Sequence, residues 1–114
     1  MARTIEYGTE QVVLHLSGLV SIGALKREVS IPYKQIKKVE VEDFKVSLLK
    51  FRVGTSIADI RQGRFLIENQ WCFVSYENHK DVVVIELEGH EFAKVAFQID
   101  DPEGVKARIE AHLQ

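Results

Sequence analysis

Hydrophobic and polar residues alternate along most of this chain with the two-residue period of β-strands. Between residues 11 and 99, runs rich in Val, Ile, Phe and Tyr are separated by Gly, Asn and charged residues about every ten positions. Over residues 11–17 the alternation places Val12, Leu14 and Leu16 on one face. This pattern predicts antiparallel β-sheet with one buried face.

Further strands follow from the same pattern. It predicts strands over residues 26–31, 39–44, 71–76, 82–87 and 92–99, with Pro32 ending the first of them and residues 88–91 forming a hairpin turn. Ile36 and Val39 have opposite parity, so a turn or bulge is expected near Lys37 or Lys38.

Two stretches are harder to assign. Residues 46–53 fit either a buried strand or a helical turn that feeds a strand, and we favour the strand. Residues 54–56 and 62–64 are turn signals. Residues 17–25 follow a strand that ends at Gly18, and are expected to form a loop.

The period changes to that of a helix at the end of the chain. Asp101 is a good N-cap, and Pro102 fits the first helical position, where its missing N–H is not needed. Val105, Ile109 and Leu113 then form one apolar stripe. A short amphipathic helix packed on the sheet is predicted.

Composition sets the class of protein. The 114 residues have room for one domain, spanning 1–114, and 46% hydrophobic with 28% charged residues is ordinary for a globular chain. The net charge of −2 argues against a nucleic-acid binder. Cys72 is the single cysteine, and no signal peptide or membrane span is recognisable, so we expect a cytoplasmic protein.

The order of several short passages resembles the bacterial PH-like (pleckstrin-homology-fold) domain family. The passages are Ile-Pro-Tyr-Lys-Gln-Ile-Lys-Lys-Val at 31–39, Gly-Thr-Ser at 54–56, Gly-Arg-Phe at 63–65, the aromatic strand 71–76, the apolar run 82–87 and the Asp-Pro-Glu helix start at 101–103. The resemblance implies a bent antiparallel barrel or sandwich of about seven strands, capped by the C-terminal helix. It also implies a binding or assembly module, with ring-like homo-oligomers among some members.

One departure from that family concerns the ligand. Phosphoinositide-binding PH domains have a basic first loop, in which several cations meet the inositol phosphates. The corresponding residues 17–25 carry no charge here, and only Lys26 and Arg27 follow them. Phosphoinositide recognition is therefore not expected.

No catalytic, metal or cofactor site is predicted. The four histidines (His15, His79, His90 and His112) lack the spacing of a metal site. Cys72 lies between aromatic residues in a strand, and is expected to be a packed side chain. Asp101 reads as a helix cap, and no glycine-rich phosphate loop exists. We therefore expect a protein that is not an enzyme.

Two groups of residues stand out as candidate contact sites. An uncharged apolar group is expected to contact a second subunit or a partner, unless it packs internally, and consists of Leu19, Val20, Ile22 and Leu25. A basic group could bind an anionic partner, and consists of Lys34, Lys37, Lys38, Arg61 and Arg64. The first predicts a homo-oligomer that also binds a protein or peptide. The second gives the disfavoured alternative, a peripheral membrane domain that binds anionic lipid headgroups.

Overall fold

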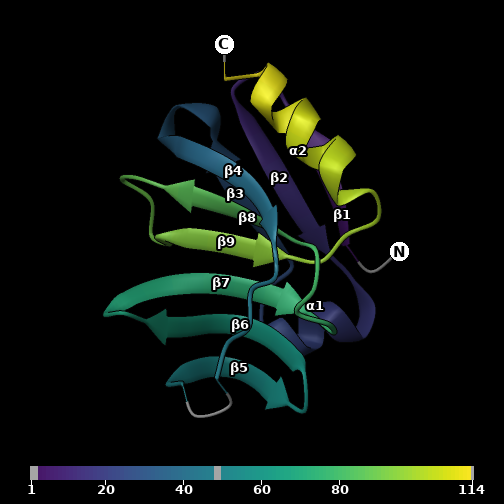
Figure 1. Ribbon diagram of the computed structural model, residues 1–114, viewed down its shortest axis with the longest axis vertical. Coiled ribbons are helices and arrows are strands. Elements are labelled where there is room, and N and C mark those ends of the chain that lie inside the picture. The colour runs from purple at the N-terminus through teal and green to yellow at the C-terminus, as the bar shows by residue number, and fades with distance from the viewer. Residues whose placement is uncertain (1–2, 48–49, 114) are drawn as a thin grey trace.

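The computed structural model describes residues 3–47 and 50–113, apart from the side chain of Leu19. These residues form two β-sheets and two α-helices (Figure 1). The smaller sheet has the order β1-β2-β3, built from β1 (Arg3–Tyr7), β2 (Gln11–Leu16) and β3 (Glu28–Pro32). The larger sheet has the order β4-β8-β9-β7-β6-β5, built from β4 (Ile36–Glu42), β5 (Arg52–Ile57), β6 (Ile60–Ile67), β7 (Gln70–Tyr76), β8 (Val82–Leu87) and β9 (Lys94–Phe97). The helices are α1 (Gly18–Ala24), α2 (Pro102–Ala111) and the 3-10 turn η1 (Tyr33–Gln35).

The predicted class, mainly β with one C-terminal helix, is confirmed, but the strand arrangement differs from the prediction. Nine strands are present in the described residues rather than about seven, and they form two sheets rather than a closed barrel. The strand β9 inserts between β8 and β7, antiparallel to β8 and parallel to β7. Because β7 and β8 run in opposite directions, any strand that lies between them is parallel to one and antiparallel to the other. The sheet is therefore mixed.

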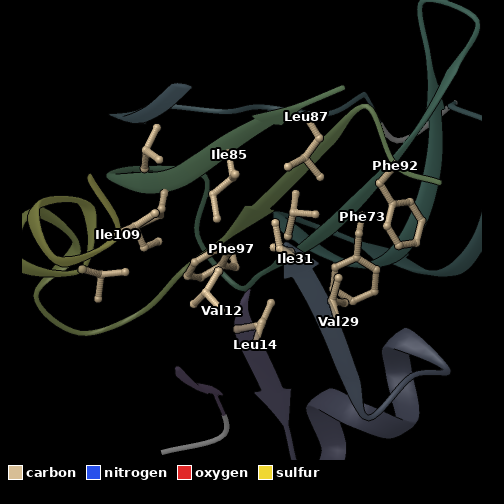
Figure 2. Close-up of a cluster of buried hydrophobic side chains, with 14 of the residues drawn as sticks. Val12, Leu14, Val29, Ile31, Phe73, Ile85, Leu87, Phe92, Phe97 and Ile109 are labelled. Carbon is tan, nitrogen blue, oxygen red and sulfur yellow. The ribbon is translucent and has the colours of Figure 1, made fainter. Parts of the chain in front are cut away.

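The main core lies between the two sheets and is closed at one end by α2 (Figure 2). Val12 and Leu14 of β2 face the larger sheet, where Phe97 and Ile85 are also fully buried. The alternation predicted for residues 11–17 is thus the inward face of β2. The bulge predicted near Lys37 is confirmed, because the pairing of β4 with β8 shifts register between Ile36 and Lys38.

On the outer face of the larger sheet, residues 44–46, rather than another sheet, cover a second apolar cluster. Val46 is 3% exposed within this cluster, which includes Phe65 and Val74. The Val46 N–H donates to the Tyr76 hydroxyl at 3.0 Å, and the Val46 carbonyl accepts from Arg61 Nε at 2.8 Å. Side chains thus satisfy a backbone that has no strand partner.

The strand predicted over 46–53 is therefore wrong at its start, since β5 begins only at Arg52. Leu48 and Leu49, which that prediction included, lie outside the described residues. The turn signals at 54–56 and 62–64 are also wrong, because both stretches lie inside the paired strands β5 and β6. Gly54 and Gly63 face each other with φ values of +146° and +125°, and the strands approach so closely there that a side chain would clash with the opposite backbone.

The C-terminal helix forms as predicted. The Asp101 carboxylate accepts from the Gly104 N–H at 3.2 Å, and Pro102 occupies the first turn. Val105 and Ile109 are buried, whereas Leu113 lies beyond the end of α2 and is 36% exposed. The helix contacts β4 and β8, so it covers one end of the core.

The loop predicted over residues 17–25 is wrong, because the helix α1 forms there. Val20 and Ala24, spaced by four residues, are buried, and α1 packs on β5 and β6. Leu25 ends the helix in the left-handed conformation with φ of 58°. The sequence did not predict this helix, because it contains two glycines and has no acidic residue in its first turn.

Candidate functional site

Strand β5 forms one edge of the larger sheet, at the end remote from α2 (Figure 1). Its neighbour is β6, and the Leu66 N–H of that strand donates to the Phe51 carbonyl at 2.8 Å. In an antiparallel ladder every second residue directs its backbone groups to the partner. The backbone groups of Arg52, Gly54 and Ser56 therefore point away from β6, along the free edge of the sheet.

Apolar side chains gather beside this edge. Phe51, Val53 and Ile57 are 67%, 46% and 63% exposed, and Ile22 and Leu25 are each 68% exposed. The helix α1 holds the last two near β5, because it packs on β5 and β6 and its Gly23 carbonyl accepts from the Thr55 hydroxyl at 3.0 Å. We call these five residues the β5 surface.

Most of the exposed large apolar side chains of the described residues belong to the β5 surface. Leu113 is the sixth of that set, and it follows the end of α2 rather than lying beside β5. Single exposed apolar residues are ordinary, whereas a group of them beside an open strand edge marks an interaction site.

Two of the other edge strands, β4 and β3, carry features that oppose pairing. On β4 the side chains of Lys38, Glu40 and Glu42 are exposed and charged. On β3 the strand ends in Pro32, and His90 Nε2 lies 2.9 Å from the Ser30 carbonyl. Charges and proline protect sheet edges from other chains. The edge formed by β5 carries one charged residue, Arg52.

Sequence reasoning found part of the β5 surface. Ile22 and Leu25 are exposed as expected for contact residues, but Val20 is 8% exposed and belongs to the core. The side chain of Leu19 lies outside the description. Phe51, Val53 and Ile57 were missed, because only the strand order reveals that β5 is an edge.

The five basic residues do not form one patch. Lys37 and Lys38 of β4 share the carboxylate of Glu86, at 3.4 and 3.8 Å. Arg61 and Arg64 belong to β6, which three strands separate from β4, a distance of roughly 19 Å across the sheet.

The remaining basic residues have separate surroundings. Arg64 lies 3.4 Å from Glu91 and packs over the Phe92 ring. Arg61 is 2% exposed, so it cannot contribute to an open basic surface. Lys34 is exposed on η1.

The histidines lie apart and have local partners. His15 lies 2.8 Å from Glu6 and 3.4 Å from Glu28, and His79 lies 3.0 Å from Asp59. Over residues 3–47 and 50–113, no cluster of three or more His, Cys, Asp or Glu side chains could hold a metal ion.

Cys72 is 3% exposed on β7, in the strand position predicted for it. Burial raises the pKa of its thiol, which Lys94 only partly offsets. Neither helix of the described chain has the length and apolar character required to span a bilayer.

The fold and the β5 surface together define a small two-sheet β-domain with an open, apolar strand edge. No protein-family model, curated protein or solved structure matches this chain. The candidate site is therefore argued from its own geometry.

Proposed function

We propose that this protein is a non-enzymatic assembly module of the PH-like kind, which pairs with a second copy of itself through the β5 surface. The observation that carries the proposal is the coincidence of an unprotected strand edge with five exposed apolar side chains. An added strand satisfies the edge N–H and C=O groups while it covers apolar surface. A reducing cytoplasm is the proposed setting, since the single cysteine is a buried thiol.

The free backbone groups restrict how two β5 strands can pair. Only Arg52, Gly54 and Ser56 direct these groups outward, so a symmetric antiparallel pair that joins two of these residues is centred on Val53, Gly54 or Thr55. Centring on Val53 places the two Val53 residues opposite each other. Centring on Gly54 places Phe51 opposite Ile57 of the second copy, and centring on Thr55 places Val53 opposite Ile57. In all three registers apolar residues meet across the new strand pair.

Charge also favours a second copy in the antiparallel direction. Arg52 lies at one end of β5, is exposed, and has no ion-pair partner among the described residues. Asp59 lies just beyond the other end of the strand. Antiparallel pairing brings the Arg52 end of each copy to the Asp59 end of the other, whereas parallel pairing would bring the two arginines together.

The oligomeric state tests this proposal. We expect light scattering to find the protein above monomer mass at tens of micromolar. Ile22→Lys, and the double variant Val53→Lys with Ile57→Lys, should shift it towards monomer while circular dichroism stays β-rich, because these side chains are exposed. Ala107→Lys on α2 is the matched control, since Ala107 is also exposed and lies outside the β5 surface.

Two outcomes would overturn the proposal. One is a wild-type protein that is monomeric across the whole concentration range. The other is an assembly that the β5 variants leave intact, or that Ala107→Lys weakens equally.

Anionic-lipid binding is the second candidate function, and one observation favours it. Lys37 and Lys38 share the single carboxylate of Glu86, so this pair of lysines keeps one surplus positive charge at the start of β4, shortly after exposed Lys34 in the chain. Sedimentation with phosphatidylserine vesicles at physiological salt tests it, and Lys37→Gln with Lys38→Gln should abolish the binding. Binding that is absent at this salt, or that the double variant retains, would exclude this function.

A further inference from the structure

A cavity of about 580 Å³ lies where residues 45–47 meet the turn between β5 and β6. Lys45, Ala58, Asp59, Arg61 and His79 contribute to its lining. Its volume falls in the range of roughly 300–1,000 Å³ that is usual for ligand sites. The cavity is distinct from the β5 surface, whose residues do not line it.

Arg61 is a buried cation without a carboxylate partner in the described part of the chain. Its Nε donates to the Val46 carbonyl at 2.8 Å, and its Nη1 donates to the carbonyls of Ala58 and Ile60 at 2.6 and 2.8 Å. All three acceptors are neutral, and no partner is found for Nη2 within residues 3–47 and 50–113. Arg61 lies near enough to Asp59 to lower the pKa of that carboxyl, but no ion pair joins the two side chains, so the guanidinium has no directly bonded counter-anion among the described residues.

A second donor without a partner lies beside Arg61. The Ser56 hydroxyl is buried and has no hydrogen-bond partner among the described residues. Ser56 pairs with Arg61 across β5 and β6, so both side chains leave the same face of the sheet. Buried polar groups are almost always hydrogen-bonded, so the unpartnered Ser56 hydroxyl, on the residue paired with Arg61, indicates a missing acceptor.

The charge around the cavity has the sign that an anion requires. Lys45 is exposed and has no ion-pair partner among the residues described. Asp59 is the one acidic lining residue, and its carboxylate is already held by His79, at 2.9 Å from the backbone N–H and 3.0 Å from Nδ1. The surplus charge is therefore positive, from Arg61 and Lys45.

We propose that this cavity binds a compact oxyanion, the phosphate or carboxylate group of a ligand, between Arg61 Nη2 and the Lys45 ammonium. A guanidinium fixed by three hydrogen bonds offers its remaining donors without loss of side-chain entropy, which suits recognition of an oxyanion. The Ser56 hydroxyl, on the residue paired with Arg61, is a further donor without a partner among the described residues.

Nuclear magnetic resonance titration tests the site, with inorganic phosphate and acetate as probes and sodium chloride holding the ionic strength constant. We expect saturable shifts of the Arg61 Nε–H and the His79 amide with at least one of the two anions. The anion that binds more tightly shows whether the site prefers a phosphate or a carboxylate group. Lys45→Gln should weaken binding by roughly tenfold through loss of a charge-assisted hydrogen bond, and Lys34→Gln on η1 should leave it unchanged.

Arg61→Lys keeps the charge but removes the Nη2 donors, so it should abolish the shifts of His79. If that variant fails to fold, Lys45→Gln still decides the question. Shifts that do not saturate with either anion, or that Lys45→Gln and Lys34→Gln affect equally, would overturn the site. The readout is local, so it is separate from the light scattering that tests self-association.

Discussion

Arg3 and Glu77 join the two sheets through a two-pronged ion pair. Arg3 Nη1 lies 3.0 Å from one Glu77 carboxylate oxygen, and Nη2 lies 2.6 Å from the other. Arg3 belongs to β1 of the smaller sheet, whereas Glu77 follows β7 of the larger sheet. Arg3 Nε also donates to the Ser75 hydroxyl at 2.7 Å, and Gln62 Nε2 donates to Glu77 at 2.9 Å. Arg3 is 5% exposed, so this pair lies at the junction of the sheets.

Arg3→Ala should lower the free energy of unfolding by about 2–3 kcal/mol, because it removes a buried charge that makes three hydrogen bonds. Urea denaturation measures the change. Arg27→Ala is the control, since Arg27 is exposed and its change should stay within about 0.5 kcal/mol. Equal effects of the two substitutions would contradict a role for Arg3 in joining the sheets.

Acid should weaken the same junction. The hydrogen bonds from Arg3 hold the pKa of Glu77 below its ordinary value of 4.5. The stabilisation is therefore fully present above pH 4.5 and is lost as the pH falls through the lowered pKa. Urea midpoints measured from about pH 6 to about pH 3 should fall less steeply in Glu77→Gln than in the wild type. Glu40→Gln, an exposed control, should retain the wild-type slope; identical slopes in all three proteins would disprove the coupling.

Gly63→Ala should destabilise the protein by more than about 2 kcal/mol. Its added Cβ would lie 2.3 Å from the Val53 carbonyl oxygen, and φ is +125°. Gly18→Ala separates the two causes, because φ is +61° there but no atom lies within 4 Å of the added Cβ. Gly18→Ala should cost only about 1 kcal/mol. Chemical denaturation measures both variants. If Gly63→Ala and Gly18→Ala lower the free energy of unfolding equally, the close approach of β5 and β6 is ruled out.

Ile109→Asp should lower the free energy of unfolding by several kcal/mol, since Ile109 is fully buried and the substitution forces a charge into the core. Thermal melting checks this. Ala107→Asp on the exposed side of α2 should remain within about 1 kcal/mol of the wild type. A melting temperature for Ile109→Asp close to that of the control would show that α2 does not close the core.

Cys72 should react slowly with thiol reagents in the native protein at neutral pH. The side chain is 3% exposed, and burial raises the pKa of its thiol, so little thiolate is available. Labelling with a maleimide, followed by mass spectrometry, measures the rate. Addition of urea should release fast labelling and serves as the positive control. Fast labelling of the folded protein would contradict the position of Cys72 in β7.

Local patterns predicted the elements whose surroundings are simple. The period of two in Val12, Leu14 and Leu16 identified the inward face of β2, because a strand with one buried face needs no other information. The Asp101 cap and the Val105 and Ile109 stripe identified α2 for the same reason. Contacts between distant segments are absent from such patterns. Consequently Gly54 and Gly63, which read as turns, proved to be partners across two strands.

What the sequence determined by itself was a mainly β domain with a C-terminal helix, the strand position of Cys72 and two exposed residues of the β5 surface, Ile22 and Leu25. Each depends on residues near one another along the chain. Only the tertiary structure decided that β9 inserts between β8 and β7, which pairs β7 with β9 in parallel, and that β5 is left as an open edge. The physical reason is that strand order depends on which faces bury most apolar surface together, and that property belongs to the whole chain rather than to any of its segments.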